Sequence, residues 1–236
     1  MKSDIILCGV GGQGILSIAT VLGQAATVAG VNLKQAEVHG MSQRGGDVQS
    51  NLRLSTEAIW SDLIPTGCAD LIISMEPMEA LRYLPFLSPE GRVVTASTPL
   101  VNIPNYPDLD ALNAELEALP RVTRIDIDAL AKEIGSPRSA NMVLLGAAAK
   151  YIGILDFKQI TDAISVIFAS KGESVVEANR KAAELGYSRA ENHDLEPEQR
   201  MYVKGADARL ARKASAQDCQ IRLSQRPFLP FKTSGT

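Results

Sequence analysis

The chain has few of the residues with which proteins build metal centres or disulfide frameworks. Its 236 residues include only two histidines and three cysteines, which are Cys8, Cys68 and Cys219. The cysteines are widely spaced and form no C-x-x-C pair, so structural zinc and iron–sulfur sites built by this chain alone are not expected. We interpret Cys8 and Cys68 as small buried residues next to apolar strands.

Long apolar runs and an excess of basic charge are also missing. No run approaches the ~20 apolar residues that a membrane span needs, and the first residues lead directly into a strand-like segment, which leaves no room for a secretory signal. The net charge of −3 gives no reason to expect a nucleic-acid partner. Because 45% of the residues are apolar and 22% are charged, we expect a globular, cytoplasmic protein with a full core.

The most informative segment of the chain is a glycine-rich turn near its start. Residues 4–14 read Asp-Ile-Ile-Leu-Cys-Gly-Val-Gly-Gly-Gln-Gly, and residues 15–28 follow with helical spacing. This is the strand, G-x-G-x-x-G turn and helix of a dinucleotide-binding fingerprint, whose backbone N–H groups favour an anion. The candidate ligand-binding residues of this turn are Gly9, Gly11, Gly12, Gln13 and Gly14.

The fingerprint is incomplete, which leaves two interpretations open. A nucleotide site requires an acid about 20 residues further on, at the end of the second strand. Glu37 is near that place, but residues 31–39 are polar and poorly strand-like. The turn therefore either binds a phosphate or nucleotide, or only packs a helix against a strand. A Walker-type loop is excluded because no Lys-Ser or Lys-Thr follows Gly14.

Strands and helices alternate along the first 134 residues, and the next segments are helical. This order predicts an α/β fold with a doubly wound, Rossmann-like, mostly parallel sheet and a helical C-terminal layer. The expected strands are 5–7, one beginning near 30–31, 48–54 with 58–60 as an antiparallel partner, 69–74, 92–96 and 122–127. The expected helices are 15–28, 75–87, 108–119, 128–134, 141–151, 157–168 and 173–185, the last closed by Gly186.

The composition changes after residue 187. Residues 188–236 carry nine Lys or Arg and six Asp or Glu, so this segment is about +3 and the rest of the chain is about −6. We expect a Rossmann-like domain over 1–187 and a C-terminal extension over 188–236, with a candidate helix at 197–214. The extension is either a solvated appendage or an arm that wraps a partner chain.

A second glycine-rich loop reads His39-Gly-Met-Ser-Gln-Arg-Gly-Gly46. An arginine among glycines suits anion binding, because the guanidinium offers fixed donors and glycines let backbone N–H groups converge. By the logic of open α/β sheets, this loop follows the second strand at the carboxyl edge, where ligands bind. Its candidate ligand-binding residues are Ser42, Gln43, Arg44 and Gly45; the alternative is a solvated turn.

Together, these two loops resemble the gamma-type domain of the 2-oxoacid:ferredoxin oxidoreductase family. The resemblance covers residues 2–187 and includes Met75-Glu-Pro77 and Asn141-Met-Val-Leu-Leu-Gly146. Within the family, the chain is similar in particular to beta subunits of two-subunit indolepyruvate:ferredoxin oxidoreductases. It implies an accessory subunit in the oxidative decarboxylation of an aryl pyruvate to an acyl-coenzyme A, with reduction of ferredoxin. It also implies that the isolated chain is inactive.

The resemblance further implies cofactors and partners that this chain does not supply. Thiamine diphosphate, magnesium and iron–sulfur clusters are expected in a larger alpha subunit, with coenzyme A as the co-substrate. A heterodimer or a dimer of alpha–beta pairs is expected. The two Gly-rich loops would shape the entrance for substrate or coenzyme A, and Gln13 would orient a carboxylate or amide. Two alternatives stay open: an NAD-dependent dehydrogenase that uses Glu37, and a non-catalytic nucleotide- or coenzyme A-binding scaffold.

Overall fold

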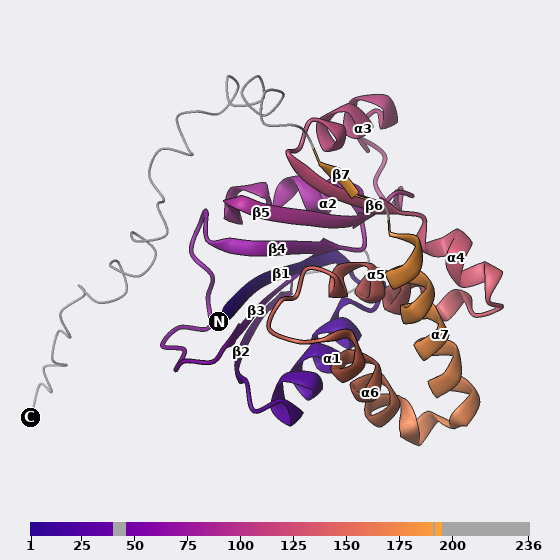
Figure 1. Ribbon diagram of the computed structural model, residues 1–236. Helices are drawn as coiled ribbons and strands as arrows, with labels where there is room; N and C mark the ends of the chain where they lie inside the picture. The colour runs from indigo at the N-terminus through magenta and orange to yellow at the C-terminus, as the bar shows by residue number, and fades with distance from the viewer. Residues whose placement is uncertain (40–45, 191, 195–236) are drawn as a thin grey trace, which may run out of the picture.

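A seven-stranded sheet lies at the centre of the protein (Figure 1). The computed structural model describes residues 1–39, 46–190 and 192–194. The sheet order is β2-β3-β1-β4-β5-β6-β7, and within these residues five strands run one way while β3 and β7 oppose them. The strands are β1 Lys2–Val10, β2 Asn32–His39, β3 Asp47–Ser55, β4 Ala69–Ser74, β5 Leu87–Ala96, β6 Arg121–Ile125 and β7 Asn192–Asp194.

Helices cover both faces of this sheet, which confirms the predicted α/β fold. The helices are α1 Ile15–Val28, α2 Pro77–Arg82, α3 Leu109–Glu117, α4 Ile127–Glu133, α5 Ala140–Ala149, α6 Phe157–Phe168 and α7 Glu173–Arg189, with short 3-10 turns at Leu84–Phe86, Pro137–Ser139 and Ala169–Lys171. Alternation along β1 separates two cores. Ile5 and Leu7 pack with α1, α5, α6 and α7, whereas Ile6 and Cys8 pack with the residues of α2 and α3.

The two strands nearest the second loop are arranged differently from the prediction. Residues 58–60 form no strand, and β3 instead pairs antiparallel with both β1 and β2. In the described sheet β2 is an edge strand that pairs only with β3, and none of its side chains from Asn32 to Val38 is buried, which explains its polar sequence. The prediction of an antiparallel strand at 58–60 was therefore wrong, and β2 is longer than its composition suggested.

The C-terminal helices pack closely through two glycines. A Cβ atom on Gly146 of α5 would lie 1.9 Å from the Ala183 carbonyl oxygen, and one on Gly186 of α7 would lie 1.9 Å from the Val143 carbonyl oxygen. The predicted helix end at Gly186 was wrong, because α7 continues through it to Arg189. Gly186 lets α7 approach α5 instead of ending the helix.

The described fold extends slightly past the domain boundary expected at residue 187. After α7, β7 adds an antiparallel strand to β6, with Asp194 opposite Arg121. The predicted helix at 197–214 lies outside the described residues. In the described part of the chain, no helix has the length and apolar character needed to cross a bilayer.

Candidate functional site

A cleft of about 840 Å³ lies at the carboxyl edge of the sheet. Segments that follow four parallel strands line it: the Gly-rich turn after β1, Met75 after β4, Thr98–Leu100 after β5, and Ile127 with Asp128 after β6. The helical layer closes the other side. This is the edge at which open α/β sheets bind ligands.

The Gly-rich turn forms one wall of the cleft. Gly12 and Gly14 both have positive φ, +103° and +84°, and Gly14 is the N-cap of α1. These left-handed conformations, which L side chains rarely adopt, turn the chain sharply from β1 into the helix. The Ser17 N–H already donates to the Gly14 carbonyl at 3.1 Å. Ile15 and Leu16, the first two residues of α1, have no carbonyl one turn earlier in the helix, so the start of α1 beside the cleft is favourable for an anion.

Gln13 holds the turn together from inside. Its Oε1 accepts a hydrogen bond from the Val10 N–H at 2.7 Å, and its Nε2 donates to the Met75 carbonyl at 3.2 Å. The side-chain amide therefore joins the turn to the segment after β4. Its observed contacts are to the protein backbone and support a positioning role.

Asn141 connects the helical layer to the same turn. Its Nδ2 donates to the Gly14 carbonyl at 3.1 Å, and the residue is buried at the start of α5. A Cβ on Gly14 would lie only 2.7 Å from that nitrogen. The fit of α5 against the turn thus depends on Gly14, and Asn141 fixes the relative position of the two walls.

Two cations that line the cleft were not predicted from the sequence. Arg138 and Lys171 both line the cleft and are exposed. Within the described chain neither forms an ion pair with a carboxylate, although the Lys171 ammonium lies 5.1 Å from the Phe168 ring centroid. Among the described residues that line the cleft, Asp128 is the only acid, so these residues together carry a net positive charge. No local sequence motif predicts the position of Arg138 and Lys171, because only the folding of the chain brings them to the cleft that the Gly-rich turn also lines.

A buried carboxylate holds the rim formed by residues 98–107. Glu76 is fully buried, and its Oε2 accepts a hydrogen bond from the Glu79 N–H at 3.0 Å. Its Oε1 accepts the Tyr106 hydroxyl and, at 3.4 Å, the Leu100 N–H. Burial and this bond to Glu76 raise the pKa of Tyr106. Glu76 therefore fastens the rim beside the cleft.

Cys8, at the end of β1, does not have the properties of a catalytic nucleophile. Burial raises the pKa of the Cys8 thiol to about 12, and its Sγ lies 3.7 Å from the Glu79 carbonyl oxygen. A thiol that stays protonated at neutral pH is a core residue, as the sequence predicted.

The structure places the two predicted loops at one edge but describes only part of the second. Ser42, Gln43, Arg44 and Gly45 lie outside the described residues, so their predicted roles stay predictions. The Gly11 N–H donates to the Gly46 carbonyl at 2.9 Å, so the end of the second loop lies against the first. Since β2 runs parallel to β1, the second loop also begins at the carboxyl edge.

Glu37 does not complete a dinucleotide site. The fingerprint acid belongs on the strand next to β1, but here β3 lies between β1 and β2. Glu37 is exposed on β2, and its Oε1 accepts a hydrogen bond from Gln35 Nε2 at 2.6 Å. The NAD-dependent alternative thus lacks its ribose ligand.

The donor set of the described residues does not suit a metal cofactor. No group of three or more His, Cys, Asp or Glu side chains that could hold a metal ion occurs in residues 1–39, 46–190 and 192–194. The described residues therefore offer no cluster of ligands of the kind that holds an iron–sulfur cluster or a structural zinc ion. They do fit an anionic organic ligand.

Comparison with known proteins identifies relatives over most of the chain. Residues 4–189 match the family described as pyruvate ferredoxin/flavodoxin oxidoreductase. Indolepyruvate oxidoreductase subunit IorB of Archaeoglobus fulgidus is 35% identical over 198 residues, covering 80% of this chain and 96% of the relative. The subunit of the same name from Thermococcus kodakarensis is 37% identical over 196 residues, covering 79% and 95%.

Solved structures share the fold at lower identity. Pyruvate oxidoreductase subunit PORC from Thermotoga maritima has a TM-score of 0.64 at 21% identity, covering 82% of this chain and 99% of that one. The 2-oxoglutarate:ferredoxin oxidoreductase from Magnetococcus marinus, with 2-oxoglutarate, coenzyme A and succinyl-CoA bound, has a TM-score of 0.61 at 22% identity, covering 79% and 30%.

Proposed function

Since this chain belongs to the pyruvate ferredoxin/flavodoxin oxidoreductase family, we propose that it is the accessory subunit of an enzyme that oxidises an aryl pyruvate. Indolepyruvate is the first candidate, because the relatives named for it are 35–39% identical to this chain. The relatives named for ketoisovalerate and 2-oxoglutarate are 24–29% identical.

The proposed reaction is the oxidative decarboxylation of a 2-oxoacid. A 2-oxoacid, coenzyme A and two oxidised ferredoxins give an acyl-coenzyme A, carbon dioxide, two reduced ferredoxins and a proton. Thiamine diphosphate supplies carbanion stabilisation and iron–sulfur clusters supply the electron route, both in a larger partner subunit. The complex is a heterodimer or a dimer of such pairs, and this chain alone is inactive.

This chain supplies the binding site for the phosphates of coenzyme A. The observation that carries this proposal is the cleft, which Arg138 and Lys171 line together with the Gly-rich turn at the start of α1. Phosphate oxygens suit both walls, because guanidinium, ammonium and helix N-terminal N–H groups all donate to anions. Ser42, Gln43 and Arg44 lie outside the described residues, and their part in this site is supported by the Gly46 carbonyl after them, which accepts the Gly11 N–H.

The remaining contacts keep the two walls in register. Asn141 and Gln13 fix the Gly-rich turn, and Glu76 fixes the rim through Tyr106. A ligand bound between preformed walls loses less entropy than one that must order them. In this account the chain anchors the polyphosphate end of coenzyme A and leaves the thiol free to reach the partner's thiamine.

The experiment measures steady-state kinetics of the complex reconstituted with the larger subunit. Arg138→Ala and Lys171→Ala each remove one charge-assisted contact, so each raises the KM for coenzyme A about 10-fold. The KM for the 2-oxoacid stays unchanged. Arg189→Ala and Lys181→Ala serve as matched controls, because both side chains are about 59% exposed on α7 and pair with other carboxylates.

Two results would contradict the proposal. Coenzyme A kinetics that do not respond to either cleft variant would make this subunit a scaffold, and an increase in the KM for the 2-oxoacid alone would place the substrate carboxylate in the cleft. The choice of 2-oxoacid is tested separately, by comparing kcat/KM for indolepyruvate, pyruvate and 2-oxoglutarate.

A further inference from the structure

The edge of the sheet opposite the cleft exposes a tryptophan on a loop with many hydrogen bonds. Trp60, the single tryptophan of the chain, is 87% exposed, and Leu63 is 55% exposed. Both lie in the connection from β3 to β4, at the edge where β1 and β4 begin. Large apolar side chains on a fixed loop are typical of a docking site.

The loop is held in place by buried polar contacts. Arg53 forms a two-pronged ion pair with Asp4, at 2.8 and 3.1 Å, and its Nη1 also donates to the Ser61 and Leu63 carbonyls at 3.1 and 3.2 Å. The Ile64 N–H donates to the buried Asn51 Oδ1 at 3.1 Å. A partner that binds Trp60 therefore loses little entropy in ordering the loop.

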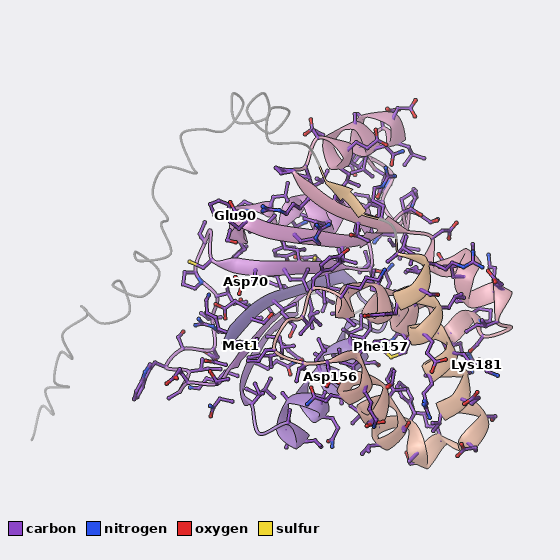
Figure 2. All side chains as sticks on the ribbon, viewed as in Figure 1. Met1, Asp70, Glu90, Asp156, Phe157 and Lys181 are labelled. Atoms are coloured by element: carbon purple, nitrogen blue, oxygen red, sulfur yellow. The ribbon has the colours of Figure 1, made fainter. Side chains whose placement is uncertain are left out.

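The residues around Trp60 are apolar or charged, and the amino-terminal ammonium of Met1 donates to Thr56 Oγ1 at 2.7 Å. Met1 is 74% exposed and its carbonyl accepts the Thr56 N–H, which places it beside the same loop. The charged residues of the loop, Glu57 and Asp62, are both exposed acids. Figure 2 shows Met1 and Asp70 along this end of the sheet. We name Met1, Glu57, Trp60, Asp62 and Leu63 the amino-edge patch.

The chain beyond β7 starts from the same edge. Asp194, the last described residue, pairs with Arg121 at the beginning of β6. Five strand spacings separate β7 from β3, roughly 24 Å at ~4.8 Å each. Residues 195–236 number 42, whereas ~8 extended residues span that distance at ~3.3 Å each. The segment is thus long enough to reach the amino-edge patch.

The sequence of this segment complements the patch. It holds eight Lys or Arg against four Asp or Glu, and it includes Arg226-Pro-Phe-Leu-Pro-Phe231. Prolines three residues apart are a spacing that exposed aromatic surfaces bind, because the polyproline II helix loses little entropy on binding. Arg226 would face Glu57 or Asp62, as a basic residue beside such prolines pairs with acids.

Relatives do not share this segment as a whole. The Archaeoglobus fulgidus relative is covered to 96% by a match that includes 80% of this chain. It therefore has no room for a counterpart of all 42 residues. This difference favours an occupant that belongs to the present chain over one common to the family's assemblies.

We propose that residues 222–231 bind to the amino-edge patch of their own chain. Trp60 packs against the proline and phenylalanine side chains of 227–231, and the acids of the patch pair with Arg222 and Arg226. This contact covers the exposed tryptophan and ties the C-terminal segment to the edge opposite the cleft.

Fluorescence of Trp60 tests the contact directly, because no other tryptophan contributes. In the full 236-residue chain, the proposal predicts that Trp60 emission is shielded from acrylamide. Phe228→Ser removes a central anchor and lowers the ratio of bound to open segment about 30-fold. Arg226→Glu lowers the ratio of bound to open segment about 5-fold. Adding Phe228→Ser to the Arg226→Glu chain lowers that ratio further. Tyr202→Ser, in the same segment but outside the motif, leaves quenching unchanged.

Several results would overturn the proposal. The first is a wild-type Trp60 that acrylamide quenches as strongly as it quenches the Phe228→Ser variant. Shielding that grows with protein concentration would identify a second copy as the occupant. Shielding of Trp60 that appears only after the larger subunit is added would identify that subunit as the occupant. For this measurement, 5-fluorotryptophan is incorporated in the present chain alone. None of these readouts uses enzymatic activity, so they are independent of the proposed function.

Discussion

Replacing Gly14 by alanine tests whether the Gly-rich turn and the helical layer fit as described. Alanine in the left-handed conformation of Gly14 costs ~1–2 kcal/mol. The new Cβ would also lie 2.7 Å from Asn141 Nδ2, so Asn141 must move and lose its hydrogen bond to the Gly14 carbonyl, a further loss of ~1 kcal/mol. We expect the free energy of unfolding to decrease by about 2–3 kcal/mol, or the Tm by about 4–12 °C for a chain of this size.

The matched control is Gly30→Ala. Gly30 also has a positive φ, +68°, but no atom lies within 4 Å of the point that an added Cβ would occupy, so this substitution carries the backbone strain alone. A double-mutant cycle then isolates the contact. In an Asn141→Ala background the clash is absent, and Gly14→Ala should cost only the ~1–2 kcal/mol of strain.

Urea and thermal unfolding of the four variants measure these differences. Equal costs for Gly14→Ala in the wild-type and Asn141→Ala backgrounds would refute the coupling between the turn and α5. A Gly14→Ala protein as stable as wild type would refute the left-handed cap itself.

Other predictions concern packing, buried charge and the rim. Gly186→Ala should lower the free energy of unfolding by about 3 kcal/mol, because α7 must move away from α5, whereas Gly153→Ala, with no atom within 4 Å, should change it by at most ~0.5 kcal/mol in denaturation experiments. Burial raises the pKa of Glu79, so its ionised form costs stability above that pKa, and the cost disappears as pH falls toward 4.5. The stability of wild type relative to Glu79→Gln should therefore increase from pH 7 to 4.5; a decrease would contradict the raised pKa. Tyr106→Phe removes the hydroxyl bonded to Glu76 and should raise the KM for coenzyme A while leaving kcat unchanged; a lower kcat alone would separate the rim from binding.

Local sequence patterns predicted most elements of the fold because each pattern had a local physical cause. The apolar run of β4 and the period of α6 gave the observed boundaries. The helix predicted over 108–119 corresponds to α3, and Asp108 caps it by accepting the N–H groups of Asp110 and Ala111. The family resemblance is confirmed by the match over residues 4–189. Tertiary pairing was not readable in this way. The insertion of β3 between β1 and β2 depends on long-range hydrogen bonds. Gly186 matches the sequence rule that a glycine ends a helix, but in the structure it lets two helices pack closely.

The site was predicted only in part for a similar reason. The Gly-rich turn carries its own signature, and Gly12, Gln13 and Gly14 of the predicted set line the cleft, whereas Gly9 and Gly11 are not among its lining residues. Arg138 and Lys171 reach the cleft through the packing of the helical layer, and no spacing in the sequence indicates that they line it together with Gly14. Gln13, expected to orient a ligand, instead bonds to the backbone at Val10 and Met75, which local sequence could not reveal.

The most direct test of the central claim compares two thiol substrates in the reconstituted complex. Pantetheine carries the thiol of coenzyme A without its phosphates, so it should not use Arg138 or Lys171. The double variant Arg138→Ala, Lys171→Ala should lower kcat/KM for coenzyme A about 100-fold and leave kcat/KM for pantetheine unchanged. Equal decreases for both thiols, or no decrease for either, would contradict a phosphate-binding role for this subunit.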